Sequence, residues 1–213
     1  MEKSDQNSLE ETMTYGLKES APIGGFILAQ SSPAGASAYL NGPTTKKTKW
    51  TLHGLWPQSA KDWTGVECCA AYKPIIESHL SALEKDLSEF WPSYDPNKTN
   101  RDFWNYEYEK HGTCALNIEA TNTVKKYFET SMDLLVENNM EHILYDCNFH
   151  PGVKYDSQLV RDTIRKEIGV NVHFRCAQDG ESLYEVRICF DTLFRRIDCP
   201  KPGNCFRENI QIM

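Results

Sequence analysis

The sequence predicts an α+β protein with a largely antiparallel central sheet and several helices packed on it. Apolar and polar residues alternate near both ends of the chain, while in the middle apolar residues recur at helical spacing. Elements grouped in this way favour an antiparallel sheet covered by helices. The length of 213 residues is within the range of one domain. We expect a flexible tail over residues 1–22 and a single domain over residues 23–213.

Strands are expected, in chain order, at 25–30, 49–53, 170–176 and 185–190. A loop rich in Ser, Ala and Gly, residues 31–42, should follow the first. In the second strand the alternation places His53 at the strand end, before a turn at Gly54 and Pro57.

Apolar stripes predict helices at 74–90, 124–135 and 159–168. The segment that ends at His111 also indicates a helix, which places Glu107 beside His111 and Tyr106 beside Lys110. Glycine accepts the left-handed conformation that often ends helices, so Gly112 is the expected stop. At this C-terminal end the helix dipole should favour the charged form of His111.

The net charge of −7 argues against a protein that coats nucleic acid nonspecifically. It does not exclude a nuclease, because the local field of one cleft decides substrate capture. The basic run Lys46, Lys47 and Lys49 is interpreted as a solvated loop. No segment is apolar enough to cross a membrane, and residues 1–20 lack the apolar core of a signal peptide. We therefore expect a mature chain, or a chain with a disordered N-terminal tail.

Two segments carry the chemistry, Trp50–Pro57 and Phe103–Cys114, and each places a histidine just before a glycine. RNA cleavage through the 2′-hydroxyl needs one group that takes a proton and one that gives a proton, and paired histidines can do both near neutrality. A cation can stabilise the charge of the phosphorane. The other histidines are expected to be structural or solvated: His79, His142, His150 and His173.

Both segments closely resemble the two active-site signatures of the ribonuclease T2 family, and the resemblance covers roughly residues 23 to 210. Members of this family are metal-independent endoribonucleases that form a 2′,3′-cyclic phosphate and then a 3′-phosphate. The resemblance implies that His111 is the general base and His53 the general acid. It implies that Glu107 and Lys110 stabilise the transition state.

The same resemblance implies a set of substrate-binding residues: Trp56, Phe103, Tyr106 and Gln30. Trp56 and Phe103 would contact the two bases and Gln30 would line a base pocket. This chain departs from the family pattern at Tyr106, where a third histidine is usual, and at Tyr108, where a Trp is usual. Residues 31–37 also lack the usual Trp and cysteines. Since tyrosine is neutral at pH 7, we expect weaker phosphate binding rather than loss of chemistry.

Eight cysteines, an even number, indicate an oxidising compartment. Adjacent Cys68 and Cys69 cannot easily bond each other. The resemblance implies that one of them bonds Cys114 and that the other bridges are Cys189 to Cys199 and Cys176 to Cys205. Elimination leaves Cys147 for the remaining member of the adjacent pair. Asn97 opens a glycosylation sequon, which is consistent with a secreted or lysosomal protein.

The sequence therefore predicts a metal-independent endoribonuclease for single-stranded RNA, a monomer that needs no cofactor, metal or membrane. The alternative is a catalytically weak family member that acts as a secreted RNA-binding, signalling or immunomodulatory protein, an interpretation that only Tyr106 and the altered loop support. A His/Cys metal protein ranks below both, because metal-ligand spacing is missing.

Overall fold

The structure is a computed structural model that describes residues 22–40, 49–69 and 77–213. The predicted tail and two of the three lysines of the basic run lie outside these residues, apart from residue 22 of the tail. The described strands are β1 (Ile23–Ser31), β2 (Thr51–Ser59), β3 (Lys154–Asp156), β4 (His173–Cys176), β5 (Ser182–Phe190), β6 (Arg196–Ile197) and β7 (Asn209–Ile212).

The described helices include two short 3-10 helices. In chain order they are α1 (Pro33–Tyr39), α2 (Glu77–Leu80), α3 (Glu84–Phe90), α4 (Asn100–Lys110), η1 (Gly112–Cys114), η2 (Glu119–Thr121), α5 (Val124–Glu137), α6 (Met140–Asp146) and α7 (Ser157–Ile168).

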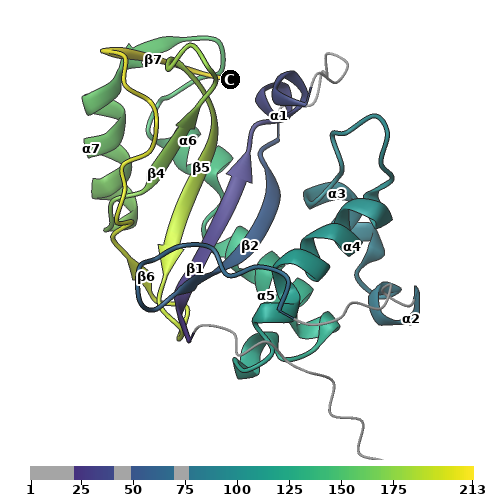
Figure 1. Ribbon diagram of the computed structural model, residues 1–213. Coiled ribbons are helices and arrows are strands. Elements are labelled where there is room, and N and C mark those ends of the chain that lie inside the picture. Colours follow the sequence, from purple (N-terminus) through teal and green to yellow (C-terminus); the bar gives the residue numbers. More distant parts are fainter. Residues whose placement is uncertain (1–21, 41–48, 70–76) are drawn as a thin grey trace, which may run out of the picture.

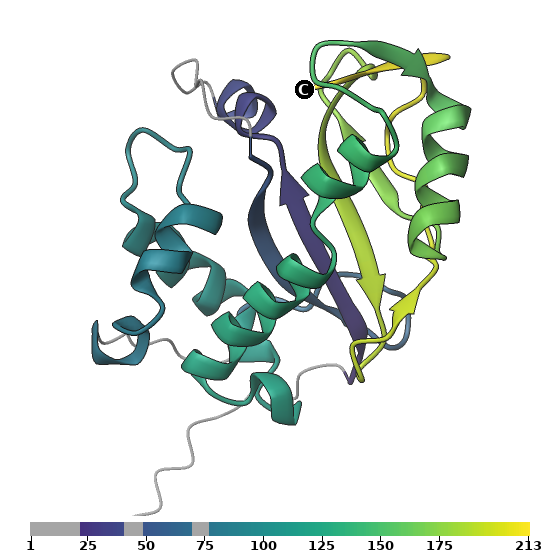
Figure 2. The same cartoon turned by 180° about the vertical axis from the view of Figure 1, so that it is seen from behind.

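The strands form one sheet in the order β2-β1-β5-β7-β3, and β4 and β6 also pair with β5. The pairs are antiparallel except β5 with β7, which is parallel. Helices α5 and α6 lie across one face of this sheet, while α3 and α4 lie beside β2 (Figures 1 and 2). The predicted α+β class with a largely antiparallel sheet is confirmed.

The core lies between the sheet and α5. Phe26 and Leu28 of β1 and Ile188 of β5 are completely buried, as are Tyr127 and Phe128 of α5, and all five belong to one apolar cluster. Burial of such side chains stabilises the fold by roughly 1.5–3 kcal/mol each. Because side chains alternate along a strand, residues next to these core positions point to the opposite face of the sheet.

A β-bulge in β2 replaces the strand end that was predicted at His53. Ala29 pairs with Gly54 and Gln30 pairs with Leu52, so His53 is an extra residue with no partner in β1. The strand then continues to Ser59 instead of turning at Gly54 and Pro57, and His53 lies inside the strand rather than at its end. The prediction was wrong because a bulge interrupts strict alternation, which from sequence resembles a strand end.

Three further expectations need correction. Residues 33–39 of the predicted loop form α1, and the predicted helix over 74–90 is divided into α2 and α3 where it is described. Gly112 does not end α4 in a left-handed conformation, because the helix stops with His111 as its cap and Gly112 starts η1. A side chain on Gly112 would collide with the Tyr108 ring, so close packing accounts for this glycine.

Candidate active site

The bulge places His53 against a buried carboxylate. Glu185 of β5 is 1% exposed, and its Oε2 lies 2.7 Å from His53 Nδ1. Glu185 also accepts hydrogen bonds from the Ser31 hydroxyl at 3.2 Å and from Arg187 Nε at 2.7 Å. With Nδ1 held by Glu185, Nε2 is the ring nitrogen of His53 that remains for a substrate.

This arrangement favours the charged imidazolium. Burial lowers the pKa of His53, but the negative charge of Glu185 and its hydrogen bond outweigh burial, so the pKa of His53 is raised above 6.5. Burial alone would raise the pKa of Glu185. The charge of His53, the His53 hydrogen bond and Arg187 instead lower the pKa of Glu185 to about 2. The pair is therefore an imidazolium and a carboxylate in mild acid.

Helix α4 carries the second set of residues and has a well-defined start. Thr99 is its N-cap: the Thr99 side chain accepts from the Asp102 amide while the Asp102 side chain accepts from the Thr99 amide. Two indoles then attach α4 to β2, since Trp104 Nε1 donates to the Trp91 carbonyl at 2.7 Å and Trp91 Nε1 donates to the His53 carbonyl at 2.8 Å. The two predicted segments are thereby joined through the core.

Glu107 lies inside this junction and is 1% exposed. Trp56 Nε1 donates to Glu107 Oε2 at 2.9 Å. Burial raises the pKa of Glu107, and the charges of His53 and Lys110 and the Trp56 bond oppose that rise only in part. A side chain at Gly54 would collide with both Trp56 Nε1 and Glu107 Oε2, so glycine is what permits this close approach.

His111 follows the last residue of α4 and is 5% exposed. Its Nδ1 is buried without a hydrogen-bond partner among the described residues. Burial lowers the pKa of His111 to about 3, and the charges of Lys110 and His53 act in the same direction. The expectation that the charged form of His111 would be favoured was therefore wrong, because burial and two neighbouring cations disfavour that charge.

Trp56 lies beside both imidazoles. Its ring centroid is 4.9 Å from that of His53 and 5.5 Å from that of His111. The Arg187 guanidinium lies 4.7 Å from the Trp56 centroid and covers one face of the indole. The structure thus brings three of the predicted residues beside one indole, namely His53, Glu107 and His111. The fourth, Lys110, precedes His111 in the chain.

Lys110 lies at the edge of this group. Its Nζ is 3.4 Å from Glu67 Oε1 and 5.5 Å from the centroid of the Tyr106 ring. Tyr106 is 43% exposed, and Lys98 lies 4.8 Å from the same ring centroid. Burial lowers the pKa of Lys110, but the Tyr106 hydroxyl and Glu67 together outweigh burial. The pKa of Lys110 is therefore raised and the ammonium stays charged. Tyr106 is therefore an exposed neighbour of two cations and not a ring packed into the core.

A cavity of about 270 Å³ opens beside His53. Phe103 and Tyr106 of α4 line one side of it, and Arg175 and Arg187 of the sheet line another. The Phe103 and His53 ring centroids are 6.1 Å apart. An aromatic side chain and partly buried cations next to the two histidines suit a substrate that carries both a ring and phosphate.

Gln30 was predicted to line a base pocket, and the structure contradicts this. Gln30 is fully buried, its Nε2 donates to the Asn138 carbonyl at 2.7 Å, and its Oε1 accepts from the Met140 amide at 3.0 Å. The reason is that side chains alternate along a strand, so Gln30 lies on the same core face of β1 as Phe26 and Leu28. The next residue, Ser31, faces the cavity instead.

The described residues, which include all eight cysteines, contain three disulfides. Cys69, and not Cys68, bonds Cys114, and the predicted bridges Cys176–Cys205 and Cys189–Cys199 are both confirmed. The predicted fourth bridge was wrong, because Cys68 and Cys147 are free thiols. The Cys68 amide donates to the Lys110 carbonyl at the end of α4, whereas Cys147 follows α6 on the helix-covered face of the sheet (Figure 2).

Several other predicted residues lie on the surface. Asn97 is exposed just before α4. Three of the remaining histidines are exposed: His79, His142 and His150. Within the described ranges, no three His, Cys, Asp or Glu side chains gather so as to hold a metal ion. None of the helices in the described part is both long and apolar enough to span a bilayer.

Sequence reasoning missed Glu185, Arg187 and Arg175. The available signal was the predicted strand over 185–190, in which alternating apolar residues leave Glu185 and Arg187 together on the opposite face. A carboxylate and a guanidinium two residues apart on one strand face indicate a polar pair that can contact a histidine from another strand. Without the sheet order, however, the residue they would face stays unknown.

The fold and the site define an α+β protein with two histidines beside one indole, and comparisons with known proteins show its family. A model of the ribonuclease T2 family matches residues 29–199. Ribonuclease Oy of Magallana gigas is 32% identical over 160 residues, 71% of this chain and 75% of that protein. Extracellular ribonuclease LE of Solanum lycopersicum is 36% identical over 166 residues, 74% of this chain and 71% of that protein.

Among solved structures, that of human RNase T2 covers 83% of this chain and 90% of its own, with a TM-score of 0.71 and 26% identity. The chain therefore belongs to the ribonuclease T2 family. It is an endoribonuclease of the T2 type.

Proposed function

We propose that the protein cleaves single-stranded RNA by transphosphorylation without a metal ion. The observation that carries this proposal is the opposite effect of the surroundings on two histidines around one indole. The pKa of His53 is raised above 6.5 while that of His111 is lowered to about 3. Over the pH range between them, one histidine holds a proton to give and the other has a free site to accept one.

In the proposed first step, His111 takes the proton of the 2′-hydroxyl as the 2′-oxygen bonds to phosphorus. The bond from phosphorus to the 5′-oxygen breaks, and His53 gives its Nε2 proton to that oxygen. The product is a 2′,3′-cyclic phosphate. In the slower second step the roles reverse. His53 takes a proton from water as the water oxygen bonds to phosphorus, the bond from phosphorus to the 2′-oxygen breaks, and His111 returns a proton to that oxygen. A 3′-phosphate results.

The remaining predicted residues have proposed roles around the phosphate and the bases. Lys110 supplies positive charge to the phosphorane and Glu107, bonded to Trp56, stabilises the same transition state. Phe103 and Tyr106 line the cavity beside His53, which suits them to contact the leaving nucleotide. Trp56 would contact the other base with the indole face that Arg187 does not cover.

The proposed setting is outside the cytosol, in a secreted or lysosomal compartment. Three disulfides support it, since such bridges persist in oxidising environments. Glycosylation at the exposed Asn97 fits the same proposal. We also propose that the protein acts as a monomer and that residues 23–213 form a single domain.

The test is incubation with single-stranded RNA in the presence of EDTA, with mass spectrometry of the cleaved ends. Cyclic-phosphate ends at undiminished rate in EDTA are expected. His53→Ala and His111→Ala should each lower turnover at least about 100-fold, the usual contribution of a positioned proton-transfer group. His142→Ala, at an exposed histidine, is the matched control. Near-normal turnover in His111→Ala would disprove the mechanism, and RNA binding without cleavage would favour the alternative of a binding or signalling protein.

A further inference from the structure

Two arginines extend the site across the open face of the sheet. Arg175 of β4 lies opposite Glu185 in the strand register, and Arg187 lies two residues further along β5. Both line the cavity that His53 lines. They occupy the strand positions between core residues such as Phe174 and Val186, so their side chains leave the sheet on the face away from α5.

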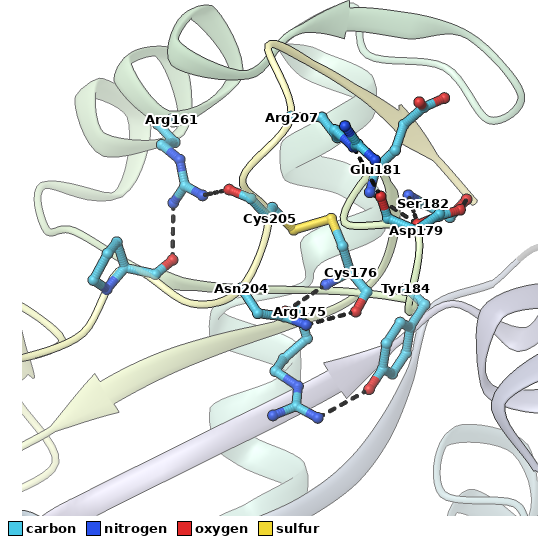
Figure 3. Close-up of a disulfide and its surroundings, with 11 residues drawn as sticks. Arg161, Arg175, Cys176, Asp179, Glu181, Ser182, Tyr184, Asn204, Cys205 and Arg207 are labelled. Carbon is cyan, nitrogen blue, oxygen red and sulfur yellow. Dashed lines mark hydrogen bonds between the residues drawn. A yellow bond between two sulfur atoms is a disulfide. The ribbon is translucent and has the colours of Figure 1, made fainter.

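Both arginines have N–H groups that make no hydrogen bond within the described residues. Arg187 uses Nε for Glu185, and its two Nη groups have no hydrogen bond within the described residues. Arg175 donates through one Nη group to the Tyr184 hydroxyl at 3.4 Å, a long bond, and its Nε is buried with no partner in the described part of the chain. Figure 3 shows the Arg175 guanidinium directed away from the Cys176–Cys205 bridge, toward that hydroxyl.

The local charge is positive at this end of the cavity. Glu185 is the carboxylate nearest in register to both arginines, and it is already shared with His53. Burial lowers the pKa of the neighbouring His173 to about 4, and the charges of Arg187 and Arg175 act in the same direction. Asp95, Lys98 and Glu107, which come from α4 and the loop before it, also line the cavity.

The direction of the substrate follows from the proposed acid. His53 gives its proton to the leaving 5′-oxygen. That oxygen belongs to the nucleotide that follows the cleaved phosphate in the 3′ direction, so this leaving nucleotide lies next to His53. His53, Phe103 and Arg175 all line the cavity, and in the sheet β1 and β5 lie between β2, which carries His53, and β4, which carries Arg175. The leaving nucleotide would therefore occupy the cavity, and the next phosphate of the strand would reach its far wall.

We infer that Arg175, together with Arg187, forms a subsite for the phosphate that follows the leaving nucleotide, so that the protein prefers strands that continue beyond the cleaved bond. This inference rests on the proposed function. Guanidinium groups with unused donors bind phosphate through paired charge-assisted hydrogen bonds. The ligand is a phosphodiester within a chain or a phosphate monoester at its end, and the test separates these two.

The test uses substrates with one ribonucleotide and hence one cleavable bond. The first is a ribonucleotide joined to one deoxynucleotide, the second adds a terminal 3′-phosphate, and the third adds a further deoxynucleotide through that phosphate. For the unaltered protein, kcat/KM should be about tenfold higher for the third substrate than for the first, the usual effect of a hydrogen bond to a charged group. A gain with the second substrate alone would identify a terminal phosphate as the ligand.

Arg175→Gln should bring that ratio close to one, while Arg175→Lys should keep part of it. Arg165→Gln, at an exposed arginine of α7, should leave the ratio unchanged. The ratio is measured within one preparation, so partial misfolding of a variant does not alter it. The salt dependence of log kcat/KM for the third substrate should also become shallower by about 0.7 in Arg175→Gln.

A ratio near one in the unaltered protein, or a ratio that survives in Arg175→Gln, would overturn the inference. Failure to cleave the first substrate would instead contradict the proposed function. In that case, binding of all-deoxy dinucleotides and trinucleotides, followed by fluorescence anisotropy, tests the subsite independently. The trinucleotide should bind about tenfold more tightly, and only while Arg175 is present.

Discussion

His53 and His111 both lie beside Trp56, yet their surroundings affect them in opposite ways. His53 shares a hydrogen bond with Glu185, so a negative charge compensates its positive charge. His111 is almost fully buried, and Lys110 and His53 repel any charge that it would gain. One residue type therefore provides both a proton donor and a proton acceptor in the proposed mechanism.

These shifts determine the pH dependence that we expect. His111 must be neutral, so kcat/KM should rise with pH through the pKa of His111, about 3. His53 must be protonated, so kcat/KM should fall as pH passes its raised pKa, above 6.5. Replacing Glu185 by Gln removes the charge that raises the pKa of His53. The falling limb should then move to lower pH, and turnover at pH 7 should decrease about tenfold or more.

The measurement is kcat/KM from pH 2.5 to pH 9 for the unaltered protein and for Glu185→Gln, together with the His53 pKa from NMR. Glu185→Asp should keep the charge and restore part of the shift. Glu208→Gln, at an exposed carboxylate, serves as the control. A rate that still rises at pH 9, or a falling limb that stays in place in Glu185→Gln, would contradict this role of Glu185 as a positioning residue.

At the scale of elements, the site depends on how closely α4 approaches β2. The bulge at His53 and the indole hydrogen bonds of Trp91 and Trp104 hold the two elements together. Gly54 lies against the Trp56–Glu107 hydrogen bond, which joins β2 to α4. The elements are regular on their own, and the chemistry arises where they meet.

Gly54→Ala should therefore damage both stability and activity. The added methyl group would push apart Trp56 Nε1 and Glu107 Oε2, and overpacking of this kind costs about 1–3 kcal/mol. We expect a lower Tm and a large loss of turnover. In Gly65→Ala the methyl group would meet only Glu67 Oε1, at an ordinary 3.7 Å, so this variant is the matched control. A Gly54→Ala protein with unchanged Tm and turnover would show that the approach is not tight.

At the scale of the whole molecule, the disulfides hold loops against the sheet and against α4. Cys176–Cys205 and Cys189–Cys199 attach the C-terminal segments to β4 and β5, and Cys69–Cys114 attaches the segment after β2 to η1. The last bridge spans 45 residues of sequence, and closure of such a loop stabilises the folded state by about 4 kcal/mol in the chain-entropy model.

Counting thiols tests this arrangement. Alkylation of the native protein should label the exposed Cys68 quickly and Cys147 slowly, since Cys147 is partly buried and burial, with Glu167 and Asp146, raises its pKa. Intact mass should show two adducts when the protein is unfolded without reduction. After reduction all eight cysteines should react. No adduct before reduction would instead indicate a fourth bridge between Cys68 and Cys147.

The sequence alone determined the features that depend on local spacing. Alternation and helical stripes predicted an antiparallel sheet with helices on it, and the structure confirms that class. The two signature segments singled out His53, Glu107, Lys110 and His111, which the fold does bring together. Short motifs carry this information because neighbouring residues on one helix or strand keep a fixed relation to one another wherever the element lies.

The tertiary structure decided what depends on contacts between distant segments. Glu185 meets His53 across 132 residues of sequence, Gln30 turns to the core face of β1, and Cys69 rather than Cys68 reaches Cys114. Burial then reversed the protonation expected for His111. The physical reason is common to all four: sheet order, the bulge register and desolvation are set by packing of the whole chain, and no local pattern encodes them.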